Sequence, residues 1–334
     1  MVQRALDAKT KPPGSLGRLE SLALQLALLQ RTTAPVVDRA RVVVFGADHG
    51  VAAEGVSAYP AAVTAEMMRN FARGGAAVTV LARANGADVE VVDVGVDADL
   101  AGLDGIVHAK VRRGTRNLAA EPAMTHAELE AALLVGRGAA RRAAQDGVRA
   151  LGLGEMGIGN TTAAAALLSA TTGDSPSATV GRGTGVSDAT LEHKRAVVDR
   201  ALRRHAAVLH DPAARFAALG GLELAAIAGA ALEAARLGIA VIVDGFISTV
   251  AVLAAMYLDP HAPLRDAIVC AHRSAERGHG LALRALGAEP LLDLDMRLGE
   301  GSGAACAIPL VRSAARILTD MATFESAGVS GRVE

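Results

Sequence analysis

This chain of 334 residues has no tryptophan and only two tyrosines and five phenylalanines. Large aromatic side chains therefore cannot fill its core, although 51% of its residues are hydrophobic. Alanine, valine and leucine must do so instead, which requires helices to pack closely on a sheet. The two cysteines, Cys270 and Cys306, lack CxxC spacing, so they indicate buried thiols in a reducing compartment rather than a disulfide framework.

An excess of charge of one sign is also missing, because 34 basic and 35 acidic residues leave a formal net charge of −1. This balance provides no overall attraction to nucleic acid or to an anionic membrane. The first 30 residues lack the apolar core of a signal peptide, and no apolar run reaches the ~20 residues that span a bilayer. We therefore expect a cytoplasmic protein with no nucleic-acid partner and no membrane span, which binds any anion through local geometry.

Short apolar runs alternate with helical patterns along the chain, which is typical of parallel strands buried on both faces. The predicted strands are residues 42–45, 89–94, 150–153, 239–243, 267–270 and 291–294. Helices are predicted at residues 16–30, 61–72, 125–145, 161–169, 188–207, 222–236 and 304–318. The pattern predicts an α/β fold with a doubly wound, mainly parallel, six-stranded Rossmann-like sheet.

The first and last predicted helices lie outside this alternation and could pack together as a smaller unit. We expect a large α/β nucleotide-binding domain at residues 33–298 and a small helical domain built from residues 1–32 plus 299–334. Ligands of such sheets bind beyond the carboxyl ends of the strands, so the residues that follow each strand form the candidate site. These are residues 46–50, 93–95, 154–155, 244–245, 272–274 and 295, and they place polar groups along one rim.

A glycine loop, GLGEMGIGNTT at residues 152–162, follows a strand and opens an alanine-rich helix. Its backbone amides at Gly157, Ile158, Gly159 and Asn160 could converge on a phosphate at the helix N-terminus. The spacing also satisfies the dinucleotide fingerprint GxGxxG, but Asp174, the acidic residue about 20 positions on, has no strand before it. The loop therefore favours a mononucleotide phosphate, with a plain tight turn as the alternative.

Two further loops follow the same logic. GRGTG at residues 181–185 leads to a helix that bears Lys194, one of four lysines in the chain, and could add amides and one cation; a surface hairpin before a solvated helix is the alternative. Asp244 and Gly245 begin a loop that resembles the ribose-phosphate loops of phosphoribosyltransferases, with one acid where those loops carry two. A strand-to-helix turn that is capped by Asp or Ser explains that loop equally well.

Glu300 is displayed between glycines in LGEGSGAA at residues 298–305, before an apolar helical run. Glycines on both sides let the backbone turn sharply beside a ligand, as a catalytic base requires, although Glu300 could instead complement the helix N-terminus. Polar rim residues that could be assembled into a metal site are Asp48, His49, His272, His279, Asp293 and Asp295. No HxH, HExxH or clustered Cys/His spacing supports such a site, so we expect no metal and no cofactor.

Taken together, seven segments resemble the nicotinate-nucleotide:dimethylbenzimidazole phosphoribosyltransferase family. They follow one another across nearly the whole chain: KPPGSLGRLE at residues 11–20, GADHGV at 46–51, GVSAYP at 55–60, GEMGIGNTT at 154–162, GRGTG at 181–185, DGF at 244–246 and LGEGSG at 298–303. The resemblance implies transfer of ribose 5-phosphate from nicotinate mononucleotide to 5,6-dimethylbenzimidazole. The products would be α-ribazole 5′-phosphate and nicotinate, and the enzyme would be a pentosyltransferase of cobamide lower-ligand assembly.

The resemblance also implies residue roles. Glu300 would remove the benzimidazole N–H proton. The ribose phosphate would be bound by Glu155, Gly157, Lys194, Ser274 and Arg297, and the aromatic base by Ser57, Ala58, Tyr59, Pro60 and Met156. A homodimer is implied, with a small domain assembled from both chain ends. The preferred acceptor stays open, since the resemblance also allows adenine or phenolic acceptors.

Two other interpretations remain open. The glycine spacing at residues 152–157 allows an NAD(P)-dependent dehydrogenase, and a non-catalytic nucleotide-binding module would need the same phosphate loop. The concentration of acids and glycines along one rim favours an enzyme over a sensing module.

Overall fold

The computed structural model describes residues 1–183 and 185–330. Within this part of the chain, six parallel strands form one sheet in the order β3-β2-β1-β4-β5-β6. Their bounds are β1 Ala40–Ala47, β2 Asp88–Gly95, β3 Ile106–His108, β4 Ala150–Met156, β5 Ala240–Val243 and β6 Ile268–Cys270. This is the doubly wound order, which reverses direction between β1 and β4 and so opens a crevice at their carboxyl ends. The predicted fold class is confirmed.

One predicted strand is wrong in its placement. Residues 291–294 do not join the main sheet; β8 (Leu292–Asp293) pairs with β7 (His272–Arg273) in a separate two-stranded sheet. The sixth strand of the main sheet is β3, a three-residue strand that follows Gly105 and pairs with β2. Three residues are too few to show a strand pattern in the sequence. The segment is kept extended by its pairing with β2.

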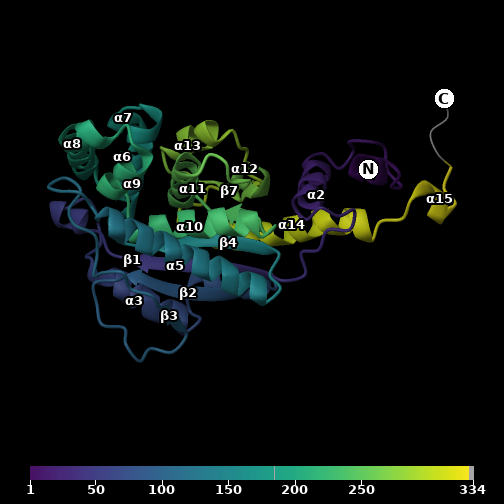
Figure 1. The fold of residues 1–334 in the computed structure, drawn as a ribbon, viewed down its shortest axis with the longest axis horizontal. Coiled ribbons are helices and arrows are strands. Elements are labelled where there is room, and N and C mark those ends of the chain that lie inside the picture. Colours follow the sequence, from purple (N-terminus) through teal and green to yellow (C-terminus); the bar gives the residue numbers. More distant parts are fainter. Residues whose placement is uncertain (184, 331–334) are drawn as a thin grey trace.

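Helices cover both faces of the sheet (Figure 1). Val43, Phe45 and Val243 belong to the core shared with α5, α6 and α8 to α13, while Val42, Val44 and Ile242 belong to the core shared with α1 to α4 and α14. The helix bounds are α1 Val2–Asp7, α2 Arg18–Leu29, α3 Ala62–Ala72, α4 Ala77–Ala84, α5 His126–Gln145, α6 Asn160–Thr172, α7 Pro176–Thr179, α8 Asp188–His205, α9 Pro212–Leu219, α10 Leu222–Arg236, α11 Phe246–Leu258, α12 Leu264–Ala267, α13 His279–Leu286, α14 Ser302–Thr319 and α15 Phe324–Ala327, with the 3-10 turns η1 Gly50–Glu54 and η2 Ala206–Val208. Alternate strand residues thus face opposite cores.

Small residues fill the core where aromatics are missing. Nearly all of α10 is buried, and it crosses α5 so closely that a Cβ at Gly136 would lie 1.8 Å from the carbonyl oxygen of Ala226. A Cβ at Gly229 would likewise lie 2.1 Å from the carbonyl oxygen of Leu133. Alanine and glycine let these helices approach to backbone contact, which is how a core with few aromatics reaches native packing density.

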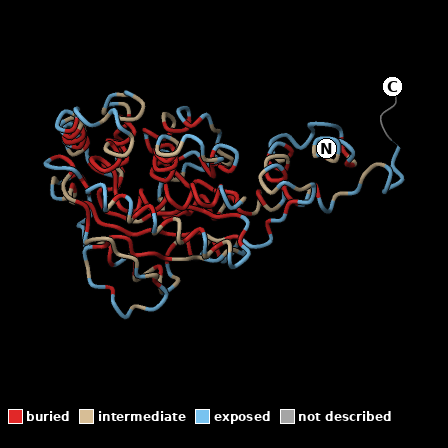
Figure 2. The backbone as a smooth tube through the Cα atoms, viewed as in Figure 1, coloured by how far each residue is buried: buried red, intermediate tan, exposed pale blue. Residues whose placement is uncertain are grey.

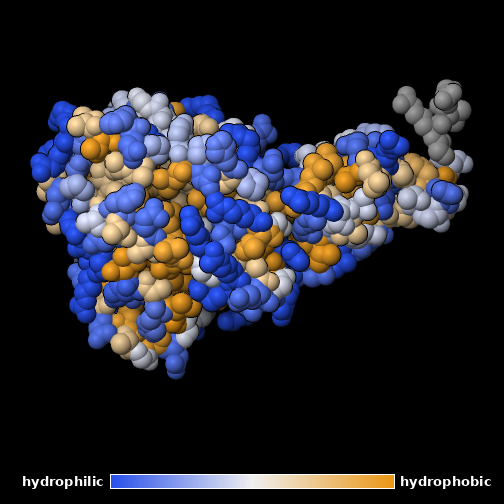
Figure 3. All heavy atoms as spheres, viewed as in Figure 1, coloured by the Kyte–Doolittle hydropathy of each residue, from blue (hydrophilic) through white to orange (hydrophobic). Residues whose placement is uncertain are grey.

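The two chain ends lie together in an extension of the molecule (Figure 1). Here α1, α2 and the end of α14 pack together, and Lys9 forms a β-bridge with Thr323. The helix α14 begins on the sheet and ends in this extension, so it joins the two parts. Figure 2 shows much less burial in the extension than around the sheet, and Figure 3 shows apolar as well as charged residues on its visible face. No helix in the described ranges is both long and apolar enough to cross a membrane.

Candidate functional site

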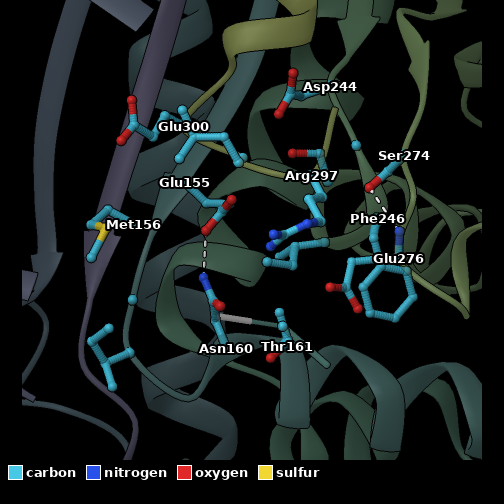
Figure 4. A pocket seen from close by; sticks show the side chains of 18 of the residues that line it. Glu155, Met156, Asn160, Thr161, Asp244, Phe246, Ser274, Glu276, Arg297 and Glu300 are labelled. Carbon is cyan, nitrogen blue, oxygen red and sulfur yellow. Dashed lines mark hydrogen bonds between the residues drawn. The ribbon is translucent and has the colours of Figure 1, made fainter. Parts of the chain in front are cut away.

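A cavity of about 690 Å³ opens at the carboxyl ends of the central strands (Figure 4). Its walls come from the segment after η1, the end of β4, the start of α6, the start of α11, the loop after β7 and the loop before α14. Thirteen of the residues that the sequence predicts for the site line it: Ser57, Tyr59, Glu155, Met156, Gly157, Ile158, Gly159, Asn160, Asp244, Gly245, Ser274, Arg297 and Glu300. The crevice rule therefore located the cavity correctly.

Three predicted residues do not belong to the lining. Ala58 and Pro60 flank the lining residue Tyr59 in the same segment. Lys194 is buried behind the wall, where its Nζ donates a hydrogen bond to Thr161 Oγ1 at 2.7 Å and would lie 3.1 Å from a Cβ at Gly183. Within the predicted GRGTG loop, Gly183 lines the cavity, and Thr184 lies outside the described residues.

Glu300 occupies an unusual backbone conformation. Its φ is +65°, and its neighbours Gly299 and Gly301 have φ of +86° and +90°. A non-glycine residue in the left-handed region is costly and is kept only when the surrounding structure demands it. The turn holds the Glu300 carboxylate at the cavity wall, where Oε2 accepts a weak hydrogen bond from the Val78 N–H at 3.4 Å. Burial raises the pKa of Glu300, and the charge of Asp244 raises it further, so the carboxylate is a stronger base than an exposed one.

The Asp244 carboxylate holds this turn through hydrogen bonds to backbone amides. Its Oδ2 accepts from the Gly301 N–H at 3.2 Å and its Oδ1 from the Ala304 N–H at 2.9 Å. The side chain is buried, and burial raises its pKa, while His272, at 3.9 Å, and the amides favour the charged form. Asp244 therefore supplies the acceptor that the first turn of α14 lacks, in addition to facing the cavity.

Glu155 is the penultimate residue of β4 and lies beside the same turn. Its carboxylate accepts a hydrogen bond from the Asn160 side-chain amide, and a Cβ at Gly299 would lie 2.3 Å from its Oε1. Burial, followed by the negative charges of Glu223 and Asp244, raises the pKa of Glu155 to about 8. This carboxyl group is thus largely protonated at neutral pH, and it can donate a hydrogen bond as well as accept one.

The glycines that match the dinucleotide fingerprint have other structural causes. A Cβ at Gly152 would lie 3.1 Å from Ala304 Cβ, and a Cβ at Gly154 would lie 2.2 Å from the Glu300 carbonyl oxygen. These glycines let β4 contact α14 and the turn before it. Gly159, with φ of +98°, is the residue before α6, whose N-terminus faces the cavity. The part of the loop that faces the cavity at the start of α6 is therefore its second half. Asp174 follows α6 rather than a strand.

The opposite end of the cavity contains residues that the sequence did not single out. Glu276 lines this end with Thr161 and Phe246, and its N–H donates to Ser274 Oγ at 3.3 Å (Figure 4). Burial raises the pKa of Glu276, while Lys194, the Gly183 N–H and Arg297 lower it. Burial also lowers the pKa of Lys194 to about 8. No local motif marks Glu276, because only the fold brings it to the GRGTG loop.

Two histidines also contribute to this region. His272 lines the cavity, and neither of its ring nitrogens has a hydrogen-bond partner among the described residues. His279 accepts from the Ser274 N–H at 2.8 Å and lies 3.1 Å from Thr249 Oγ1, and burial lowers its pKa to about 4. His279 is thus a neutral support for Ser274. Within residues 1–183 and 185–330, no group of three or more His, Cys, Asp or Glu side chains is placed to hold a metal ion.

Comparisons with known proteins agree with this geometry. Residues 1–329 match a protein family described as phosphoribosyltransferase. A protein of Chromobacterium violaceum is 56% identical over 323 residues, which cover 97% of this chain and 93% of that protein. One of Cupriavidus necator is 52% identical, with 98% and 94% covered. Both are named nicotinate-nucleotide–dimethylbenzimidazole phosphoribosyltransferase.

Solved structures give the same result. The crystal structure of CobT from Thermus thermophilus matches with a TM-score of 0.94 and 52% sequence identity, covering 98% of both chains. These similarities extend over the extension as well as the sheet, and they do not support the dehydrogenase or the non-catalytic module. The chain belongs to the nicotinate-nucleotide–dimethylbenzimidazole phosphoribosyltransferase family.

Proposed function

We propose that this protein transfers the 5-phosphoribosyl group of nicotinate mononucleotide to 5,6-dimethylbenzimidazole, giving α-ribazole 5′-phosphate and nicotinate. The observation that carries this proposal is the buried Glu300 carboxylate, held in a left-handed turn at the wall of the cavity. The names of the relatives, which match along almost the full length of the chain, support the two substrates.

The chemistry requires one base and a site that orients two molecules. The bond between C1′ and the pyridinium nitrogen breaks, and its electron pair neutralises the ring, so nicotinate leaves without a pyrophosphate. One benzimidazole nitrogen attacks C1′ from the opposite face, which inverts the configuration from β to α. Glu300 takes the proton from the other nitrogen. Its raised pKa suits this role, because a base works best when its pKa lies nearer the operating pH.

The cavity offers two ends for the two parts of the nucleotide. We assign the phosphate to the end with the N-terminus of α6, Ser274 and Arg297, where amides and a guanidinium favour an anion. Lys194 acts there from behind Thr161 and Gly183. We assign Glu155 and Asn160 to the ribose, with Asp244 and Gly245 beside them. The acceptor base lies near Glu300 and Met156, against the segment 57–60.

The remaining expectations stay predictions. They are a homodimer, a cytoplasmic location, and the division into residues 33–298 and a small domain of residues 1–32 plus 299–334. Leu28 and Val36 are exposed large hydrophobic residues near the extension, which is compatible with burial against a second copy.

The test is to incubate the purified chain with nicotinate mononucleotide and a panel of bases and to identify products by chromatography and mass. Glu300→Gln should keep nucleotide affinity, while turnover falls by about 10²- to 10⁴-fold because the base is lost. Glu130→Gln, on the exposed face of α5, is the matched control and should behave like the wild type. Wild-type turnover by Glu300→Gln would remove Glu300 from the mechanism. Absence of α-ribazole 5′-phosphate with the wild-type chain would refute the proposed function.

A further inference from the structure

A completely buried pair of polar side chains lies beneath the glycine loop at residues 157–159. His49 Nε2 and Glu223 Oε1 are 2.5 Å apart, and both side chains are fully excluded from solvent. His49 follows β1, and Glu223 lies in the first turn of α10, so the pair joins two elements that are 174 residues apart. Neither residue is among those that line the cavity.

The pair is in contact with the glycines of the loop. A Cβ at Gly157 would lie 3.2 Å from Glu223 Oε1 and 3.3 Å from His49 Cδ2, and a Cβ at Gly159 would lie 3.2 Å from His49 Cβ. On its other side, a Cβ at Gly221 would lie 2.3 Å from His49 Cε1. A loop of glycines has few side chains to anchor it, so its position depends on the groups on which it packs.

The pair also affects the charge of the cavity wall. The negative charge of Glu223 raises the pKa of Glu155, as does that of Asp244, whereas Asn160 and the Glu300 N–H lower it. The other titratable or charged groups along this wall are His272, Glu276, Arg297 and Glu300. Asp48, which is also buried, lies next to His49, and burial raises the pKa of Asp48 while His49 lowers it. His49 Nε2 is the side-chain atom that faces Glu223 Oε1, so it is the hydrogen-bond partner of this carboxylate.

Stability alone does not account for the pair. His49 Nδ1 and Glu223 Oε2 have no hydrogen-bond partner among the described residues. Burying two polar groups that are only partly satisfied costs free energy, and replacing such a pair with apolar residues is often neutral or stabilising. A role in the neighbouring site explains the arrangement better.

We propose that His49 and Glu223 are positioning residues for phosphoribosyl transfer: they support the loop Gly157–Gly159 beneath the nucleotide and set the charge that Glu155 experiences. This inference rests on the proposed function, since its main readout is the transfer reaction. It predicts opposite effects for the two partners. Removing the Glu223 charge lowers the negative field at Glu155, whereas removing His49 leaves the Glu223 carboxylate without its hydrogen-bond partner and so strengthens that field.

The experiment measures the pH profile of kcat/KM for nicotinate mononucleotide in Glu223→Gln, His49→Asn and the double variant. The limb that belongs to Glu155 is first identified as the one that Glu155→Gln abolishes. We expect this limb to move to lower pH in Glu223→Gln and to higher pH in His49→Asn, with the double variant following Glu223→Gln. KM for the nucleotide should rise about tenfold in His49→Asn because the loop loses support, with a smaller change in kcat.

The matched control is Glu233→Gln on the same helix. Glu233 Oε1 pairs with Arg141 Nε at 2.7 Å near the surface, so this variant removes an ion pair of α10 without touching the loop. Its pH profile and KM should equal those of the wild type. Shifts in the same direction in both partner variants, or no shift in Glu223→Gln, would overturn the inference.

Two complications leave the inference testable. If His49→Asn does not fold, judged by circular dichroism, Glu223→Gln alone decides, because it preserves size and hydrogen bonding. If the wild type forms no α-ribazole 5′-phosphate, the proposed function fails; binding of nicotinate mononucleotide across pH, measured by calorimetry, then tests the pair separately. If the pH dependence of nucleotide binding is then the same in Glu223→Gln as in the wild type, the positioning role of the pair is refuted.

Discussion

Replacing Asp244 with alanine tests how the fold holds Glu300 at the cavity. The carboxylate accepts hydrogen bonds from Gly301 and Ala304 at the start of α14, at 3.2 Å and 2.9 Å. Because the side chain is buried, alanine would leave both amides without a partner and away from water. The turn that contains Glu300 would lose its main support.

The magnitude follows from these two bonds. Loss of a helix N-cap costs ~0.5–2 kcal/mol, and each buried polar group left unpaired costs ~1–3 kcal/mol. The desolvation that raises the pKa of Asp244 offsets part of this loss. We expect the free energy of unfolding of Asp244→Ala to fall by about 2–4 kcal/mol. Turnover should fall as well, since Glu300 is adjacent to Gly301.

The assay is urea unfolding beside a matched cap variant. Asp211 caps α9 by accepting from the Ala214 N–H at 2.7 Å, in an exposed position away from the cavity. Asp211→Ala should lose ~0.5–2 kcal/mol and keep wild-type turnover. If Asp244→Ala loses no more stability than Asp211→Ala, or stays within about 0.5 kcal/mol of the wild type, the carboxylate does not hold α14 and the reasoning fails.

Two further predictions concern protonation and packing. The pKa of Glu155 is raised from the usual 4.5 to about 8, so the native state keeps a proton that the unfolded chain releases. The stabilisation that this group contributes is therefore greatest at low pH and is lost as the pH rises between those two values. Measured by urea unfolding across this pH range, the free energy of unfolding should fall less steeply in Glu155→Gln than in the wild type. Equal slopes in the two proteins would contradict this prediction. Gly136→Ala should destabilise by ~1–3 kcal/mol or more through its clash with Ala226. Gly138→Ala, where only Arg142 Nη1 comes within 3.4 Å, should stabilise by ~0.5–1 kcal/mol. Equal changes of Tm in these two variants would refute the account of the α5–α10 contact.

Several parts of the site were predictable because their signals are local. A strand that ends in glycine or acid, followed by a helical pattern, marks the carboxyl edge of a parallel sheet. This logic placed Glu155, Asp244 and Ser274 around one cavity, and the structure confirms it. Glu300 between glycines is local too, since the left-handed turn is encoded by its neighbours. The roles of these residues in the reaction stay predictions.

Other parts depended on contacts between distant segments. The spacing of Gly152 and Gly154 satisfied the dinucleotide fingerprint, whereas in the structure these glycines let α14 and the turn before it contact β4. Lys194 was expected at the phosphate, and the structure buries it behind Thr161.

The amino-acid sequence by itself determined the alternation of strands and helices, the alanine-rich core and the acidic turn, because each depends on residues close together in the chain. Only the tertiary structure decided that Asp244 caps α14, that Glu276 lies beside Lys194, and that His49 and Glu223 meet beneath the glycine loop at residues 157–159. The physical reason is the strand order, which brings the loops after β1, β4 and β5 to one edge of the sheet. Pairings across that edge are set by burial and geometry rather than by any spacing along the chain.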